Sequence, residues 1–353
     1  MEITVKFWKG KKVFITGHTG FKGSWLTLWL KELGADICGY SLIPPTTPNF
    51  FSLANINTGI TSHIADIRDL TTLKDSLRKS EAEIVIHFAA QPLVRKSYQE
   101  PIETYTTNVL GTVNILEAAR NTSTVRCILN ITSDKCYENI ENNNAFTESD
   151  PMGGHDPYSA SKGCSELITS SYSKSFFEES GVILASARAG NVIGGGDWAQ
   201  DRLIPDIIQA FSTQQNAIIR SPNATRPWQH VLEPLSGYLI LCEAMYRQDK
   251  KYAGPWNFGP HKHDIKPVKH IVKELSNLWG ENAVYTLQET STSVHEAQTL
   301  RLDCTKAIKT LNWQPKWTIE QALSHTVSWY KAYSNDEDIR AFTLKQIQKY
   351  CES

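Results

Sequence analysis

The sequence predicts an α/β fold, with a doubly wound parallel sheet and a second, smaller mixed α/β domain. Three observations predict it. Short apolar runs alternate with amphipathic stretches over the first two-thirds of the chain, the runs are continuous in Val, Ile and Leu, and a glycine-rich turn follows the first of them. Continuous apolar runs between helices are typical of parallel strands that are covered on both faces.

The predicted elements follow one another in a regular order. Strands are expected over 13–16, 36–40, 83–90, 125–133 and 182–187, and helices over 21–33, 71–79, about 102–120 and about 157–177. After about residue 189 we expect helices near 202–211, 232–247, 267–278 and 319–333, with short strands over 217–220, 256–258 and 299–302. This pattern predicts one domain over 1–188 and another over 189–353, with about 228–260 returning to the first.

Composition limits the class of function. The 353 residues carry a formal net charge of −1, without the positive excess of proteins that bind nucleic acid or membrane surfaces. No apolar stretch approaches the ~18 residues of a membrane helix, and the charged N-terminus does not match a secretory signal. The seven cysteines form no C-x-x-C pair, which favours reduced thiols over disulfides or zinc. We therefore expect a cytoplasmic protein without a metal site, a nucleic-acid partner or a membrane partner.

A glycine-rich turn opens the first predicted helix. Residues 16–23 read T-G-H-T-G-F-K-G and directly follow the first strand. In this setting glycines permit a tight turn, let backbone N–H groups approach a pyrophosphate and allow close helix–sheet packing. A plain tight turn is the alternative, but the strand–turn–helix setting favours a dinucleotide site on a Rossmann-type fold.

The second strand carries no acid where ribose recognition usually requires one. Its end reads Gly39-Tyr40-Ser41-Leu42, and Asp36 lies at the opposite end of the strand. No arginine that could bind a 2′-phosphate lies in this region either. The sequence therefore favours NAD over NADP as the cofactor.

Two polar clusters are candidates for catalysis. Tyr158 and Lys162 lie four residues apart, on one face of a predicted helix, where an ammonium stabilises a phenolate and lowers the pKa of the tyrosine. Ser133, Asp134 and Lys135 follow an apolar strand, at the end where active sites of such folds lie. A hydroxyl that orients a substrate and an acid/base couple would explain this second cluster, and a polar loop turn is the alternative.

These motifs carry a family resemblance. Together they resemble the extended short-chain dehydrogenase/reductases that act on nucleotide sugars: the glycine-rich turn, Phe88-Ala89-Ala90 after a strand, N-V-L-G-T at 108–112, Ser133, and Tyr158-x-x-x-Lys162. The resemblance spans residues 10 to about 333. Four stretches narrow it to the dehydratases of this family, namely HFAAQPLVRKSY at 87–98, TSDKCYEN at 132–139, ARAGNVIGGGDWAQDRLIPD at 187–206 and RPWQHVLEPLSGYL at 226–239.

The resemblance implies bound NAD, a nucleotide-sugar substrate, and a dehydration that supplies dideoxysugars for bacterial surface polysaccharide. Tyr158 would take the proton of the sugar 4-hydroxyl with help from Ser133, Lys162 would bind the nicotinamide ribose, and Asp134 would protonate the departing 6-hydroxyl. Lys135 stands where related dTDP-glucose dehydratases carry Glu. We hypothesise that it is the base at C5, for which it must be neutral, and a purely electrostatic role is the alternative.

The resemblance also assigns the binding residues. For the cofactor they are Gly17, His18, Thr19, Gly20, Phe21, Lys22, Gly23, Asp66, Ile67, Phe88, Ala89, Ala90, Asn108, Thr132, Tyr158 and Lys162. For the substrate they are Gln91, Ser133, Asn191, Arg202, Leu203, Arg226 and Arg301. Arginine suits the substrate pyrophosphate, and Asp66 could accept from the adenine amine. Such proteins usually form homodimers through a four-helix bundle, here the helices near 102–120 and 157–177, and a higher assembly stays open.

Two other functions stay open. A nucleotide-sugar 4-epimerase would share the cofactor, Tyr158, Lys162 and Ser133, but it needs no acid/base couple for C6, so Asp134 and Lys135 argue against it. A non-catalytic NAD-binding sensor on the same fold would be expected to lose the tyrosine or the lysine, and this chain has both. The nucleotide base that the site selects does not follow from the residues.

Overall fold

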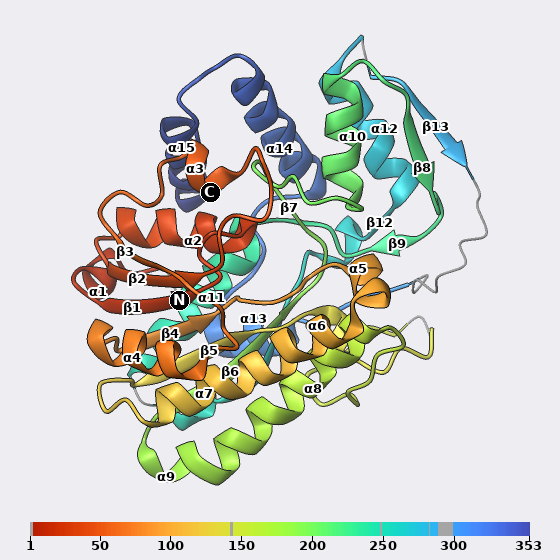
Figure 1. Ribbon diagram of the computed structural model, residues 1–353. Coiled ribbons are helices and arrows are strands. Elements are labelled where there is room, and N and C mark those ends of the chain that lie inside the picture. The colour runs from red at the N-terminus through yellow and green to blue at the C-terminus, as the bar shows by residue number, and fades with distance from the viewer. Residues whose placement is uncertain (1–2, 142–143, 248, 282, 289–298) are drawn as a thin grey trace.

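A seven-stranded parallel sheet forms the centre of the protein (Figure 1). This computed structural model describes residues 3–141, 144–247, 249–281, 283–288 and 299–353. The sheet order is β11-β6-β5-β4-β1-β2-β3. Its strands are β1 (Lys12–Thr16), β2 (Asp36–Ser41), β3 (Thr61–Ile64), β4 (Ile84–His87), β5 (Cys127–Ile131), β6 (Ile183–Ala189) and β11 (Gly254–Phe258). The predicted doubly wound α/β fold is confirmed.

Helices cover both faces of this sheet (Figure 1). On one face lie α4 (Leu70–Ser80), α7 (Gly111–Arg120) and α8 (Pro157–Tyr172), and on the other lie α2 (Phe21–Glu32) and α11 (Leu232–Tyr246). The side chains of β1 alternate accordingly, because Phe14 packs with Leu73 and Ile115, whereas Val13 and Ile15 belong to the core of the opposite face. Burial on both faces explains why the strands read as continuous apolar runs.

The remaining described elements form a smaller mixed part beside the large sheet (Figure 1). Its helices are α10 (Leu203–Ser212), α12 (Val268–Trp279), α14 (Ile319–Ser334) and α15 (Ile339–Glu352), whereas α13 (Thr305–Leu311) packs against β11 and α11 of the large sheet. Its strand pairs are β7 (Val192–Ile193) with β10 (Gln229–His230), β8 (Ala217–Arg220) with β13 (Tyr285–Gln288), and β9 (Thr225–Arg226) with β12 (Lys266–Pro267). The intervening α11 and β11 belong to the large sheet, since β11 pairs with β6.

Short helices complete the connections. They are α1 (Val5–Trp8), α3 (Phe50–Leu53), α5 (Val94–Gln99), α6 (Pro101–Tyr105) and α9 (Glu178–Ser180), with 3₁₀ turns η2 (Asp134–Cys136), η4 (Lys250–Tyr252) and η5 (Lys262–Asp264). Two π turns, η1 (Thr106–Leu110) and η3 (Ser173–Phe177), lie within the predicted long helices. A π turn shifts the helical register by one residue and is frequent at functional sites.

Some predicted elements differ from the observed ones. The strand predicted over 299–302 is wrong, because Thr299 and Leu302 make only isolated bridges, to Thr225 and Phe146. The strand predicted over 83–90 ends at His87, where the chain leaves the ladder. The sequence pattern did not predict β3, which is half-exposed and mixes polar with apolar residues, or α15.

The described residues were compared with the expectations on thiols, membrane helices and metal sites. All seven cysteines are free thiols. Among the described helices none is both long enough and apolar enough to cross a bilayer. Within the same parts of the chain, no three His, Cys, Asp or Glu side chains are grouped to hold a metal ion.

Candidate active site

The predicted catalytic residues meet where β5 ends and α8 begins. Ser133 and the 3₁₀ turn η2 directly follow β5, and α8 packs against that turn. Nζ of Lys162 donates a hydrogen bond of 3.2 Å to the carbonyl oxygen of Ile131, which ties α8 to the end of the strand. The tertiary structure therefore brings together two clusters that are separated in the sequence by the loop between η2 and α8.

The start of α8 is fixed by local interactions. Asp156 caps the helix by accepting a hydrogen bond of 3.0 Å from the backbone N–H of Ser159, and Pro157 occupies the first helical position. Tyr158 and Lys162 are therefore set one turn apart near the helix N-terminus. Both side chains are buried.

Asp134 is a buried carboxyl group, only 3% exposed. Burial raises the pKa of Asp134 to about 6, against the opposing effects of Lys135, the Ser133 hydroxyl and Arg226. Oγ of Ser133 donates to Oδ1 of Asp134 across 3.2 Å, and Oδ2 is buried without a hydrogen-bond partner in the described structure. A carboxyl group with this pKa can hold a proton near neutral pH, as a general acid must.

The tyrosine and the lysine show opposite shifts. Burial raises the pKa of Tyr158 to about 12, although the Ser133 hydroxyl and the Arg202 guanidinium lower it. Burial also lowers the pKa of Lys162 to about 8, against the attraction of Glu166. The sequence argument that the lysine would lower the pKa of the tyrosine is thus outweighed here, because desolvation penalises both charged forms.

The glycine-rich turn leaves room for a phosphate group at one position. A Cβ on Gly23 would lie 2.1 Å from the carbonyl oxygen of Gly17, and Gly17 itself has φ +75° and closely approaches the end of β4. A Cβ on Gly20 would meet only that same oxygen, at 3.4 Å. Gly20 is also the N-cap of α2 and offers no side-chain cap, so the first N–H groups of the helix lack side-chain acceptors. This cradle fits the pyrophosphate of a dinucleotide.

Hydroxyl groups lie at the end of β2, where an acid was expected and not found. Oγ1 of Thr19 is 2.8 Å from Oγ of Ser41 and donates to the carbonyl oxygen of Leu42 at 2.9 Å. His18 lies under the turn, with Nε2 2.7 Å from Oγ of Ser62, and burial lowers its pKa to about 4. His18 is therefore a neutral packing residue in this structure.

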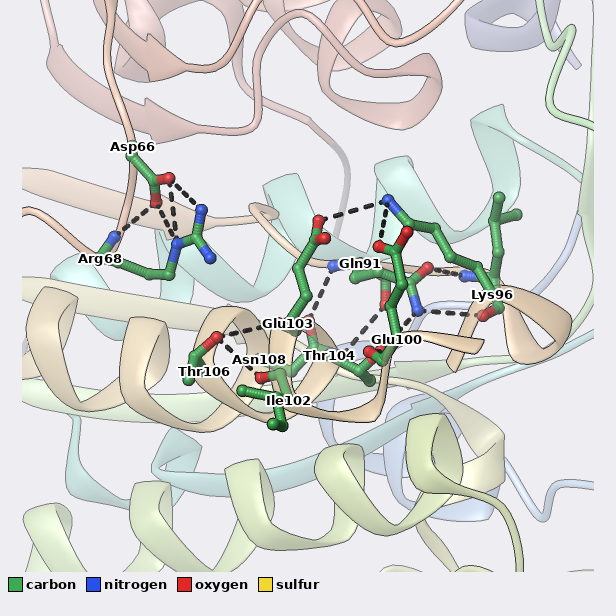
Figure 2. A network of polar contacts seen from close by, with 11 residues as sticks. Asp66, Arg68, Gln91, Lys96, Glu100, Ile102, Glu103, Thr104, Thr106 and Asn108 are labelled. Atoms are coloured by element: carbon green, nitrogen blue, oxygen red, sulfur yellow. Dashed lines mark hydrogen bonds and ion pairs between the residues drawn. The ribbon is translucent and has the colours of Figure 1, made fainter. Parts of the chain in front are cut away.

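Figure 2 shows that three predicted binding residues, Asp66, Gln91 and Asn108, are already engaged by protein groups. Both carboxylate oxygens of Asp66 accept from Arg68, at 2.5 to 3.0 Å. The side chain of Gln91 donates to Thr104 at 2.9 Å, and its backbone is held by Asn108 on both sides. The amide of Gln91 thus holds its own loop in place, and its assignment to the substrate by the resemblance stays a prediction.

The other predicted cofactor residues surround the same region. Ile67 and Thr132 are buried, whereas Phe88, Ala89, Ala90 and Lys22 are half-buried as whole residues. Nζ of Lys22 donates to the hydroxyl of Tyr238 at 3.3 Å. Burial lowers the pKa of Lys22 to about 7, and Lys162 and Arg202 lower it further. The glycine-rich turn and the Tyr/Lys helix are therefore within electrostatic range of each other.

Two of the three predicted arginines lie within electrostatic range of the predicted catalytic residues. Arg202 donates to Oδ2 of Asp197 at 2.9 Å and lowers the pKa of Tyr158. Arg226 is buried and lowers the pKa of Asp134. Nε of Arg301 is buried without a hydrogen-bond partner among the described residues.

The last two predicted substrate residues lie on neighbouring segments. Asn191 accepts from the backbone of Gln229 through its carbonyl oxygen at 3.0 Å, and Leu203 begins α10. Sequence reasoning missed Asp197, although the unusual G-G-G-D-W stretch was a signal that could have found it.

A tyrosine and a lysine one helical turn apart, beside a glycine-rich turn on a parallel sheet, define a short-chain dehydrogenase/reductase. The chain belongs to the GDP-mannose 4,6 dehydratase family, whose model matches residues 14–326. It is 51% identical over 353 residues to the CDP-glucose 4,6-dehydratase of Salmonella typhimurium, covering 99% of this chain and 98% of that protein. It is also 26% identical to the dTDP-glucose 4,6-dehydratase of Haemophilus influenzae, over 90% of this chain and 97% of that one.

Solved structures share the fold. The dTDP-glucose 4,6-dehydratase of Bacillus anthracis in complex with NAD superposes with a TM-score of 0.77 at 20% identity, covering 93% of this chain and 99% of that one. The UDP-glucose 4-epimerase of Thermotoga maritima with UDP-glucose gives a TM-score of 0.77 at 21% identity, over 91% and 99%. At this identity the likeness concerns the fold alone.

Proposed function

We propose that this protein is a CDP-glucose 4,6-dehydratase, a hydro-lyase that converts CDP-D-glucose to CDP-4-keto-6-deoxy-D-glucose and water. The observation that carries the proposal is the 51% identity over nearly the whole of both chains. The four stretches quoted from the sequence point to the same member of the family. Asp134 and Lys135 beside Ser133 add the acid/base pair that loss of water requires.

The cofactor of this reaction is NAD, held by the glycine-rich turn. The open cradle at Gly20 supports this assignment, as does the NAD complex of the Bacillus anthracis dehydratase. NAD, when bound, would accept a hydride from C4 and return it to C6. Lys162 binds the nicotinamide ribose, and its ammonium offsets part of the cost of a buried phenolate on Tyr158.

The side chains divide the proton transfers. Tyr158 takes the proton of the sugar 4-hydroxyl, and Ser133 orients that hydroxyl. Lys135 removes the C5 proton once the 4-keto group has acidified it. Asp134 then protonates the 6-hydroxyl as it leaves, which its raised pKa of about 6 allows near neutral pH. The water released contains the C6 oxygen.

Cations hold the nucleotide part of the substrate. Arg202, Arg226 and Arg301 bind the pyrophosphate, with Asn191 and Leu203 beside them. The guanidinium groups of Arg202 and Arg226 lie within electrostatic range of Tyr158 and Asp134, and this position beside the proposed catalytic residues supports the role. Residues 1–188 with about 228–260 then form the NAD-binding domain, and the rest of 189–353 binds the nucleotide sugar.

A homodimer through a four-helix bundle accompanies this function. Large apolar side chains are exposed along the helices near 102–120 and 157–177, among them Ile102, Leu110 and Leu167, at 79%, 46% and 61%. These exposed apolar side chains lie on the helices that the resemblance assigns to the bundle, and this position supports the interface. A Leu167→Glu variant is expected to sediment as a monomer, whereas Ile308→Glu, on α13, is not. A dimer that survives Leu167→Glu unchanged contradicts this assembly.

The function is tested with four nucleotide sugars side by side. Purified protein with NAD is incubated separately with CDP-glucose, dTDP-glucose, UDP-glucose and GDP-mannose, and each product is treated with alkali. A 4-keto-6-deoxy product gives an alkali-sensitive chromophore, which is expected for CDP-glucose foremost. A hexose that keeps its 6-hydroxyl would identify an epimerase, and NAD binding without turnover would identify a sensor.

A further inference from the structure

A buried ion pair lies directly behind the catalytic residues, and the proposed chemistry does not use it. Nη2 of Arg188 donates to Oε2 of Glu166 at 2.7 Å, and the two side chains are 3% and 4% exposed. Glu166 lies on α8, one turn after Lys162, and Arg188 lies on β6. A buried ion pair is weak support for stability, because desolvation offsets most of the attraction between the charges. Its place in the fold therefore suggests another role.

Both carboxylate oxygens of Glu166 are occupied. The hydroxyl of Thr132 donates to Oε1, and the hydroxyl of Ser186 donates to Oε2 at 2.7 Å beside Arg188. Thr132 immediately precedes Ser133 in the chain. The carboxylate of Glu166 thus joins α8, the end of β5 and β6 at one point, and holds the residue from which the catalytic segment begins.

Arg188 holds the other end of the same segment. Its Nη1 donates to the hydroxyl of Tyr137 at 2.8 Å, and that hydroxyl donates to Oδ1 of Asn257 at 2.7 Å. All of these side chains are buried. Since Tyr137 ends the turn that begins after Thr132, the ion pair supports the catalytic segment from both sides.

Glu166 also faces the ammonium of Lys162. The titratable groups that face this ammonium are Glu166 and Tyr158 on α8, Cys136 on η2, Lys22 on α2 and His87 at the end of β4. Burial and the positive charge of Lys22 disfavour the charged lysine, and Glu166 is the carboxylate in this set that favours it.

We propose that Glu166, paired with Arg188, is a positioning residue of the active site. Its carboxylate fixes the end of β5 through Thr132. It also favours the charged form of the buried Lys162 ammonium while Tyr158 takes the proton of the sugar 4-hydroxyl. This inference rests on the proposed function, because Lys162 is assigned there to the cofactor ribose and to the phenolate.

The test is the pH profile of Glu166→Gln. The variant keeps the shape of the side chain and removes its charge. The alkaline limb of kcat/KM that follows Lys162, whose pKa is about 8, is therefore expected to move down by about one pH unit, whereas the earlier fall that follows Asp134, whose pKa is about 6, stays in place. Above the limb this shift equals a loss of about tenfold relative to the wild type. The affinity for NAD, measured by calorimetry across the same pH range, is expected to fall at a correspondingly lower pH.

A second buried glutamate supplies the control. Glu233 on α11 is fully buried and accepts hydrogen bonds from the backbone of Lys316 and Trp317, far from the catalytic segment in the chain. Glu233→Gln is expected to lower stability and to leave the alkaline limb in place. An unchanged limb in Glu166→Gln, or an equal shift in Glu233→Gln, overturns the proposal.

A milder variant decides the matter if Glu166→Gln does not fold. Glu166→Asp keeps the negative charge but moves it away from its partners by the length of one methylene group. The alkaline limb of this variant is therefore expected to shift by less than that of Glu166→Gln. A limb of Glu166→Asp identical to the wild type then overturns the proposal. Failure of the proposed function looks different, because the wild type itself would not turn over CDP-glucose.

Discussion

The hydroxyl of Ser133 donates a hydrogen bond to Oδ1 of Asp134 across 3.2 Å, and the same hydroxyl lowers the pKa of Tyr158. One hydroxyl therefore lies between the group proposed to accept the first proton and the group proposed to donate the last. The contact also stabilises the ionised form of Asp134, yet burial outweighs it and leaves the pKa of the carboxyl at about 6.

This raised pKa gives the first prediction. Asp134 is protonated below about pH 6 and loses its proton above it, so loss of the 6-hydroxyl is expected to slow as the pH rises beyond 6. Asp134→Asn is expected to lower the rate of product formation by about 10²–10⁴-fold and to abolish this dependence. Oxidation at C4, followed as NADH absorbance, should persist. A variant with wild-type turnover would contradict the assignment.

Two variants decide whether Lys135 is the base at C5 or acts only through its charge. If it removes the C5 proton, Lys135→Gln and Lys135→Arg are both expected to lose washout of deuterium from C5, by at least about 100-fold. A helper that acts only through its charge would be replaced by arginine. Mass spectrometry of substrate labelled at C5 measures the exchange, and wild-type-like washout and turnover in Lys135→Gln would remove this lysine from the mechanism.

Asp197 is expected to act on substrate binding through Arg202. Its Oδ2 accepts from Nη1 of Arg202 at 2.9 Å, and its Oδ1 accepts from the backbone of Ala199 at 3.1 Å. Asp197→Asn is expected to raise KM for CDP-glucose about tenfold with little change in kcat, because the guanidinium loses a charged partner. The matched control is Asp201→Asn in the same loop, whose ion pairs are exposed and contribute little. Equal effects of both variants on KM would contradict the role of Asp197.

Two glycines of the same turn are expected to respond differently to alanine. Gly23→Ala places a Cβ 2.1 Å from a backbone oxygen, so the free energy of unfolding is expected to fall by about 1–3 kcal/mol. Gly20→Ala meets only an ordinary contact and should keep the wild-type Tm, but its methyl group fills the phosphate cradle. Thermal unfolding and NAD titration separate the two effects. A Gly20→Ala variant with wild-type NAD affinity would contradict the cradle.

The sequence predicted most of the large sheet because both faces of its central strands are buried. Continuous apolar runs such as those of β1, β4 and β5 need no tertiary information to be recognised. The strand β3 was missed because it is half-exposed and has no continuous apolar run. The strand over 299–302 was wrong because its residues make only isolated bridges to distant segments, and the local sequence does not show this. The glycine-rich turn and the pair Tyr158 and Lys162 were likewise readable, since their spacing is local.

Several properties of the candidate site follow only from the tertiary structure, because they depend on contacts between segments that are distant in the sequence. The sequence offered Asp134 as an acid, but its pKa of about 6 comes from burial beneath elements that lie far away in the chain. The hydrogen bond between the amide of Gln91 and Thr104 is likewise known only from the fold. The sequence did not indicate the pairing of Glu166 with Arg188, which are 22 residues apart and meet inside the protein. Desolvation and long-range pairing set these properties, and neither has a local signature in the sequence.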